Sequence, residues 1–130
     1  MSVLIKTSLA PWLAVPNGTT AIDFYKKAFG AREAYHLDDP GGGVVSRLEI
    51  DGGEFWLSGS STDDSSSVPA PTDPSVRMIW TVADPDPAFD RAIAAGALIV
   101  FPVSEGYGWR VGRLVDPFGH HWEIGRELKR

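Results

Sequence analysis

The second half of this 130-residue chain repeats the first half at a constant spacing. Identical residues recur 66 positions apart in six pairs: Gly30 and Gly96, Val45 and Val111, Arg47 and Arg113, Leu48 and Leu114, Gly53 and Gly119, and Trp56 and Trp122. No gap is needed anywhere between these pairs, which chance similarity would seldom give. Each half reads as a strand, a helix, a strand and a hairpin of two further strands. The repeat therefore predicts two βαβββ modules.

The first module is expected over about residues 5–59. Ile22, Tyr25 and Phe29 recur at helical spacing, and Gly30 suits the left-handed end of a helix. Thr19 or Thr20 could cap the start of this helix. The predicted elements are a strand over Leu9–Val15, a helix over Ala21–Phe29, and strands over Arg32–Leu37, Val44–Ile50 and Glu54–Ser58. The triple glycine at 41–43 precedes a strand, which favours a hairpin over a phosphate cradle.

The second module is expected over about residues 75–128, after an exposed linker at 60–74 that is rich in Ser, Asp and Pro. Its predicted elements are a strand over Val76–Val82, a helix over Ala88–Ala95, a strand over Ala97–Val103, and two strands joined by a turn within Tyr107–Gly125. Each helix can cover one face of a four-stranded sheet, and two such sheets can curl around a shared cavity. The expected fold is of the α+β class, a single domain with a cupped mixed β-sheet.

Composition and charge exclude several partners and chemistries. The chain carries a net charge of −5 and has no cluster of Lys and Arg, which argues against nucleic acid. No apolar run approaches the roughly 20 residues of a membrane span, and the first residues do not read as a secretory signal, so we expect a cytoplasmic protein. Without cysteine, disulfides and thiolate chemistry are excluded. The serines concentrate in the linker, so a Ser/His/Asp triad is not indicated.

The chain resembles the glyoxalase/bleomycin resistance/extradiol dioxygenase superfamily, also called the vicinal oxygen chelate proteins. The resemblance rests on the paired modules and on three segments: AIDFYKKAFGA over Ala21–Ala31, GAxxxxP over Gly96–Pro102, and GWRVGRLVDPFGHHWEI over Gly108–Ile124. It covers nearly the whole chain. It specifies a fold more closely than a function, because that superfamily includes lyases, dioxygenases, fosfomycin-modifying enzymes and proteins that only sequester an antibiotic. It also implies a homodimer, since similar proteins complete their pockets across modules or subunits.

The resemblance does not imply a metal site in this chain. Metal-dependent members place His, Gln or Glu ligands at four strand positions, which fall here at Ala10, at Leu57, at Arg77 or Met78, and at Glu123. Only Glu123 has a ligand-type side chain, whereas a divalent ion needs about three protein ligands. We therefore expect no metal cofactor. A shifted site remains an alternative, because residues 121 and 123 share one strand face.

Six residues are predicted to line the pocket: Trp12, Trp80, Trp109, Arg110, His121 and Glu123. Strand alternation places Trp12 and Trp80 on the cavity face, and it places Trp56 and Trp122 beneath the helices. Arg110 is expected to contact a ligand or Glu123. Aromatic walls around a carboxylate suit a flat or cationic ligand, although each tryptophan could equally fill the core.

The other polar residues of the last hairpin have simpler interpretations. His121 could form a hydrogen-bonded pair with Glu123 and act as a ligand anchor or a general base. His120 points to the opposite face. Arg113 is assigned to the scaffold because it has a repeat partner, and Asp116 is explained by its turn.

The expected function is metal-independent binding of a small molecule, of the bleomycin-resistance type. The ligand would be an antibiotic or an aromatic or cationic metabolite. The alternative is a glyoxalase- or dioxygenase-like metalloenzyme with an atypical centre at His121 and Glu123. A third interpretation is a structural domain whose main role is to form a dimer interface. No nucleic-acid or membrane partner is expected.

Overall fold

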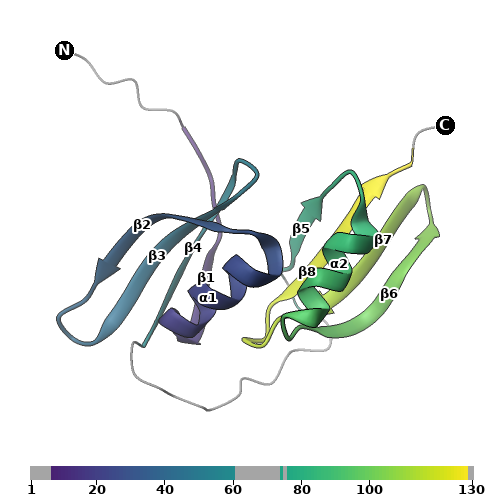
Figure 1. The fold of residues 1–130 in the computed structure, drawn as a ribbon. Helices are drawn as coiled ribbons and strands as arrows, with labels where there is room; N and C mark the ends of the chain where they lie inside the picture. Colours follow the sequence, from purple (N-terminus) through teal and green to yellow (C-terminus); the bar gives the residue numbers. More distant parts are fainter. Residues whose placement is uncertain (1–6, 61–73, 75, 129–130) are drawn as a thin grey trace.

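The computed structural model describes residues 7–60, 74 and 76–128 of the chain. Within this range the chain forms two four-stranded mixed sheets with one helix on each, so the predicted tandem βαβββ architecture of the α+β class is confirmed. Figure 1 shows the two modules next to each other. Apart from residues 60 and 74, the predicted linker lies outside the described residues.

The first module consists of β1 (Trp12–Asn17), α1 (Gly18–Phe29), β2 (Arg32–Asp38), β3 (Gly43–Ile50) and β4 (Gly53–Ser60). Its sheet order is β1-β4-β3-β2, with β1 parallel to β4. Strand β1 begins after Pro11 rather than at Leu9, and a proline has no amide hydrogen to donate to a sheet. Helix α1 is capped by Asn17, whose side-chain oxygen accepts from the amide of Thr20 at 3.0 Å. The prediction of a threonine cap was therefore wrong.

The second module consists of β5 (Met78–Thr81), α2 (Pro85–Ala94), β6 (Leu98–Gly106), β7 (Trp109–Val115) and β8 (His121–Glu127). Its sheet order is β5-β8-β7-β6, with β5 parallel to β8. Helix α2 begins at Pro85, three residues before the predicted start, because a proline suits the first helical turn. None of the helices among the described residues is long and apolar enough to cross a membrane.

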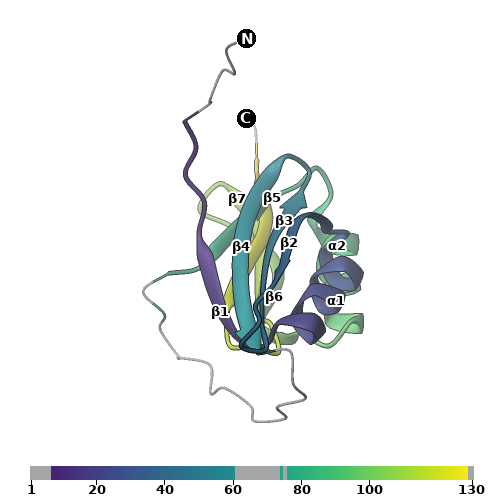
Figure 2. The same ribbon diagram turned by 90° about the vertical axis from the view of Figure 1, so that its left-hand side faces the viewer.

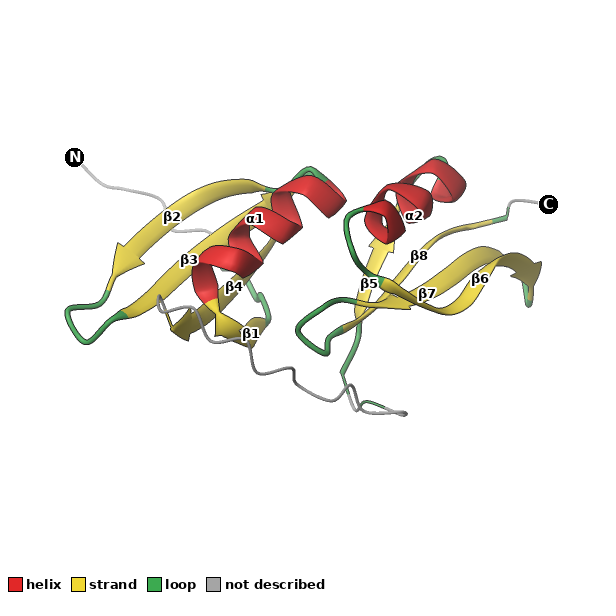
Figure 3. Cartoon of the chain, turned by 60° about the horizontal axis from the view of Figure 1, so that its bottom comes forward, coloured by secondary structure: helices red, strands yellow, loops and turns green. Residues whose placement is uncertain are grey.

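Both helices lie on the same side of the two sheets, as the turned views in Figures 2 and 3 show. The centre of each sheet is fully buried on this helix side, at Leu48, Leu57, Leu114 and Ile124. We call the opposite side of the two sheets the open face. Large apolar side chains are exposed there: Trp12 is 55% exposed and Ile79 is 58% exposed.

The two modules pack against each other through α1. The Tyr25 ring lies against Phe55 of its own module and against Phe118 and Trp122 of the other. Its hydroxyl donates to the Asp116 carboxylate at 2.6 Å. Aromatic residues thus form one core that joins both modules.

The repeat changes its offset at the hairpin turns. Before the turns, Leu48 and Leu114 are equivalent, and both are buried. Leu48 pairs with Phe55, but Leu114 pairs with Trp122, so the offset after the turns is 67 rather than 66. The second turn holds one more residue than the Asp51-Gly52 turn of the first module. One additional residue in the turn moves every later side chain of the strand to the opposite face of the sheet, because strand side chains alternate.

This one-residue shift reverses the predicted faces of Trp56 and Trp80. Trp56, and not Leu57, is equivalent to Glu123, so the prediction that Trp56 packs beneath the helices was wrong. Leu57 lies there instead, fully buried. Trp80 is also on the helix side, where its ring packs edge-on against Phe29 at 5.5 Å.

Candidate functional site

An aromatic cluster lies on the open face of the first module. Trp12 of β1 and Trp56 of β4 stack with ring centroids 5.7 Å apart and planes within 8° of each other. Tyr35 of β2 leans on Trp56 at 5.6 Å, and the Arg47 guanidinium lies 5.2 Å from the centre of the same ring. The Trp12 indole donates to the hydroxyl of Ser58 at 2.9 Å, which fixes the ring orientation. The cluster presents flat aromatic surface to solvent.

A hollow of about 280 Å³ lies on the open face of the second module. Its walls are mostly apolar and come from β5, β7, β8 and the β6–β7 turn. The lining residues are Ile79, Thr81, Gly106, Tyr107, Trp109, Val111, Glu123 and Gly125. Two of the predicted pocket residues, Trp109 and Glu123, therefore lie together in one hollow. Its volume is near the lower end of the range for small-molecule pockets.

The carboxylate of Glu123 is held by two arginines. Its Oε2 lies 2.5 Å from Nε of Arg77, and it accepts from Nη2 of Arg113 at 2.7 Å and from Nε at 3.2 Å. The Glu123 side chain is mostly buried, so these contacts are only partly screened by water. Two guanidinium groups against one carboxylate leave this cluster with a positive charge.

These residues do not fit a divalent metal. A metal at Glu123 would stand beside the guanidinium groups of Arg77 and Arg113, which both contact Oε2, and their positive charges would repel it. Within the described ranges, no group of three His, Cys, Asp or Glu side chains is arranged to hold an ion. The metal-ligand position of the fourth strand falls at Trp56 after the offset correction, which cannot ligate a metal either.

Arg110 and Trp80 lie away from this site. Arg110 forms a two-pronged ion pair with Asp86 of α2, at 2.7 and 2.8 Å, and it does not reach Glu123. This pair holds the start of α2 to β7. The contact with Glu123 that the sequence suggested for Arg110 is made by Arg113, three positions along the same strand.

The two adjacent histidines differ in their surroundings. The Nε2 of His120 lies 2.9 Å from the carbonyl oxygen of Ala14 and so ties the turn before β8 to β1 of the other module. His121 is only 4% exposed and shares its strand face with Glu123. Neither nitrogen of its ring makes a hydrogen bond with Glu123 or with any other residue that the structure describes. The expected hydrogen-bonded pair is therefore not formed.

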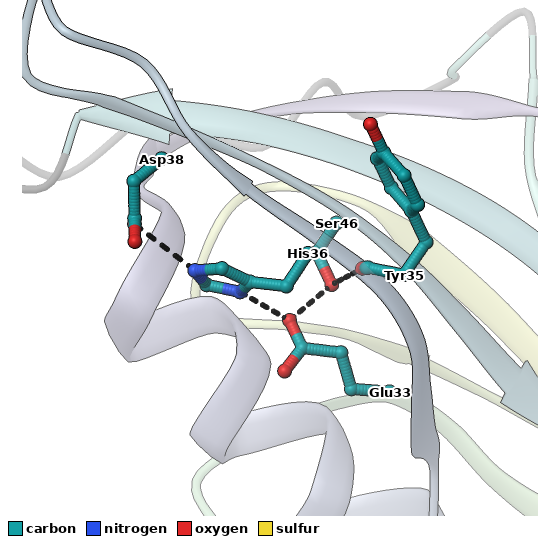
Figure 4. A network of polar contacts seen from close by, with 5 residues as sticks. All are labelled: Glu33, Tyr35, His36, Asp38 and Ser46. Carbon is teal, nitrogen blue, oxygen red and sulfur yellow. Dashed lines mark hydrogen bonds and ion pairs between the residues drawn. The ribbon is translucent and has the colours of Figure 1, made fainter.

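A polar network also lies on strands β2 and β3, as Figure 4 shows. His36 lies 2.6 Å from Glu33 and 3.0 Å from Asp38. The buried hydroxyl of Ser46 donates to Glu33 at 2.7 Å rather than to the imidazole. A serine activated for nucleophilic attack donates its proton to a base such as imidazole, so this arrangement does not constitute a catalytic triad.

Three residues of the site escaped prediction: Trp56, Arg77 and Arg113. The first was assigned to the wrong face because the 66-residue offset was carried through the turn. The turn sequences contain the missing signal, since Asp51-Gly52 closes a two-residue hairpin whereas 116–119 is a longer turn. Comparing the two turns would have placed Trp56 and Arg77 on the open face.

Comparison with known proteins agrees with this fold and repeat. The sequence model of the Glyoxalase/Bleomycin resistance protein/Dioxygenase superfamily matches residues 7–124. The chain belongs to this superfamily.

Two relatives carry little functional information. Protein Mb0911c of Mycobacterium bovis, described as uncharacterized, is 34% identical over 99% of this chain and 89% of its own length. Rv0887c of Mycobacterium tuberculosis, also described as uncharacterized, is 34% identical over 99% of this chain and 79% of its own length.

Solved structures with the same fold include proteins of different kinds. TioX from Micromonospora sp. ML1 is 28% identical, with a TM-score of 0.70 over 94% of this chain and all of its own. The fosfomycin resistance protein FosX from Listeria monocytogenes has a TM-score of 0.73 over 96% of each chain. At 16% identity, FosX is similar in fold alone.

Proposed function

We propose that this protein binds a small planar aromatic molecule on its open face without a metal, in the manner of the antibiotic-binding members of its superfamily. One observation supports this most directly: Trp12 and Trp56 are stacked in parallel, and Trp12 is half exposed. A tryptophan that only fills a core would be buried. An exposed, oriented ring pair is suited to stacking against a flat ligand.

The hollow beside Glu123 supports the same proposal. It has the apolar lining and the few polar groups that are typical of small-molecule sites. Its aromatic residues are Tyr107, in the turn between β6 and β7, and Trp109, at the start of β7.

The charges on the open face favour an uncharged or anionic ring over a cationic one. Glu123 already faces two arginines, and Glu54 faces Arg47 at 3.5 Å. A cationic ligand would have to displace a guanidinium from either carboxylate, which costs the existing pair. The proposed ligand is therefore an uncharged or anionic aromatic molecule rather than a cationic one.

The experiment compares 2-naphthol with decahydro-2-naphthol, which has the same ring skeleton but is not planar. Isothermal titration calorimetry and tryptophan fluorescence should show at least tenfold tighter binding of the planar compound. Trp12→Ala should weaken naphthol binding about 2- to 10-fold, because an aromatic pair contributes about 0.5–1.5 kcal/mol beyond area burial. Leu98→Ala is the matched control, since Leu98 is exposed but lies on edge strand β6 outside the site.

Two results would contradict this function. Equal affinity for the planar and saturated compounds would show that the tryptophans do not stack on the ligand. Stabilisation of the protein by Zn²⁺, Mn²⁺ or Ni²⁺ alone, in a thermal-shift assay after EDTA treatment, would favour the metalloenzyme alternative at residues 121 and 123.

We also propose that the protein is a homodimer that completes the binding cup across subunits. The open faces of both modules point to the same side in Figure 2, so the chain does not fold them onto each other. Exposed apolar residues on this side, such as Trp12 and Ile79, would be covered by a second copy.

A further inference from the structure

A second cavity lies at the seam between the two modules. It measures about 190 Å³ and lies between the start of β1, the residues before β5 and the start of β8. Its lining residues are Pro11, Trp12, Leu13, Val76, Arg77, Met78, His120 and His121. The volume is several times the roughly 30 Å³ that one water molecule occupies in the liquid. A compact polar group fits here, but a fused ring system does not.

His121 is the unusual member of this lining. Its residue is 4% exposed, and both ring nitrogens are buried without a hydrogen-bond partner in the described part of the chain. Leaving buried donors and acceptors unpaired costs about 1–3 kcal/mol for each group. A buried imidazole beside a cavity therefore calls for a bound group that pairs with it.

The charges around the cavity determine which kind of group fits. Its lining contains Arg77 and two histidines but no carboxylate. The nearest described acid on this strand face, Glu123, is neutralised by Arg77 and Arg113. A cation in this cavity would be repelled by the Arg77 guanidinium. An oxyanion could instead accept hydrogen bonds from that guanidinium and from an imidazole N–H.

We propose that the seam cavity is a binding site for a compact oxyanion, such as a phosphate or carboxylate group, held by His121 and Arg77. Its polar groups, His121 and Arg77, do not belong to the aromatic cluster, although Trp12 contributes to the walls of both sites. Both modules supply walls, since Pro11, Trp12 and Leu13 come from the first module and the polar groups from the second. A bound anion would therefore tighten the contact between the modules.

The test uses inorganic phosphate as the probe, with acetate as the carboxylate counterpart. Calorimetry on the full chain should show saturable binding of at least one of them. Long-range proton–nitrogen NMR of the histidine rings should show the His121 nitrogens shifting on titration, while those of His36 stay unchanged. His121→Leu replaces the imidazole with an apolar side chain of similar volume. This variant and Arg77→Met should each weaken anion binding at least tenfold.

Matched controls come from the same residue types outside the cavity. His36→Leu removes an exposed histidine, and Arg32→Met removes an arginine whose partner is Glu49. Both controls should bind the anion within twofold of the wild type. The proposal is overturned if neither anion binds saturably, or if His121→Leu binds like the wild type.

Naphthol binding distinguishes this proposal from the proposed function. We expect His121→Leu to bind 2-naphthol like the wild type while it loses the anion. If the anion binds and naphthol does not, only the proposed function fails. If naphthol binds and neither anion does, only the seam site fails.

Discussion

Asp116 shows how one residue can have a role that its local sequence does not reveal. Its Oδ1 accepts from the backbone amides of Phe118 and His120, which is the turn role that the sequence predicts. Its Oδ2 accepts from the Tyr25 hydroxyl and the Trp122 indole, and the carboxylate is buried. Burial, followed by the adjacent negative charge of Asp116, raises the pKa of Tyr25 well above its ordinary value. This carboxylate therefore also joins α1 to the second module.

His36 lies between two carboxylates on strand β2. Hydrogen bonds to Glu33 and then to Asp38 raise the pKa of His36 above 6.5. Partial burial would by itself raise the pKa of Glu33, but hydrogen bonds from Ser46 and His36 outweigh it and lower that pKa below 4.5. The imidazolium thus bridges two carboxylates on edge strand β2.

We predict that His36→Gln destabilises the protein more at pH 5.5 than at pH 8.5. The raised pKa means that protonated His36 contributes stability fully below 6.5 and loses that contribution as the pH rises through its folded value. Glu33, with its lowered pKa, contributes to stability above pH 4.5, so the contributions of His36 and Glu33 are both present at pH 5.5. Urea unfolding at both pH values should show a difference of less than about 1 kcal/mol, since the network is largely exposed.

Arg32→Gln provides the control for this pH dependence, because it removes a surface ion pair with Glu49 that contains no histidine. Its cost should be the same at both pH values. A His36→Gln cost that does not change with pH would show that the imidazolium does not bridge the carboxylates in solution.

The β-hairpins show how turn length decides which face a strand presents. In the first module, Ile50 pairs directly with Gly53 across two residues, and the later strand places Trp56 on the open face. In the second module, the amide of Asp116 donates to the carbonyl of His120 across three residues, and the equivalent open-face residue is Glu123. The modules therefore differ in chemistry, with an aromatic wall in one and an ion-paired wall in the other.

Strand β7 also depends on a glycine at its centre. A Cβ at Gly112 would lie 2.9 Å from the Phe89 ring of α2 and 2.9 Å from the backbone nitrogen of Val103 on β6. These contacts are too short for a side chain, so α2 and β6 can approach β7 only where it lacks one.

We predict that Gly112→Ala destabilises the protein by about 1–3 kcal/mol, as expected for overpacking in a close-packed core. Urea unfolding followed by circular dichroism measures this change. Gly106→Ala is the matched control, because a Cβ there would meet no atom within 4 Å and the backbone is not left-handed. Equal stability of the two variants would contradict the close approach of α2 to β7.

The whole molecule has one covered side and one open side. The helices and the shared aromatic core cover one side of both sheets, whereas the open face keeps apolar residues in contact with solvent. Edge strand β6 adds four exposed apolar residues in a row: Leu98, Ile99, Val100 and Phe101. An exposed apolar surface of this kind is typical of an interaction site.

We predict that the wild-type chain sediments as a dimer at micromolar concentration. Ile79→Glu should shift the sedimentation equilibrium toward the monomer, because it places a charge in the centre of the open face. Asp90→Lys on the exposed side of α2 is the control for a charge change and should remain dimeric. A monomeric wild type would contradict the homodimer proposal, and a dimeric Ile79→Glu would place the interface elsewhere.

The repeat, the helix periodicity and the glycine turns are local patterns, so the fold class and most element positions could be read from the residues alone. Helix α1 was predicted to end at Phe29 with Gly30 as its stop, and the structure confirms both. The placement of the site depended instead on a one-residue difference between two turns, because strand alternation turns a single shift into a change of face.

The partners of individual side chains lay beyond prediction from sequence for a similar reason. The residues that hold Glu123 are Arg77, which precedes the neighbouring strand β5 and is far away in sequence, and Arg113, which was assigned to the scaffold. The His121 nitrogens, which have no partner among the described residues, lie beside a cavity that residues of both modules line together. Periodicity therefore determines the elements and the faces they bury, whereas contacts between residues distant in sequence decide which charges are paired and which buried groups remain for a ligand.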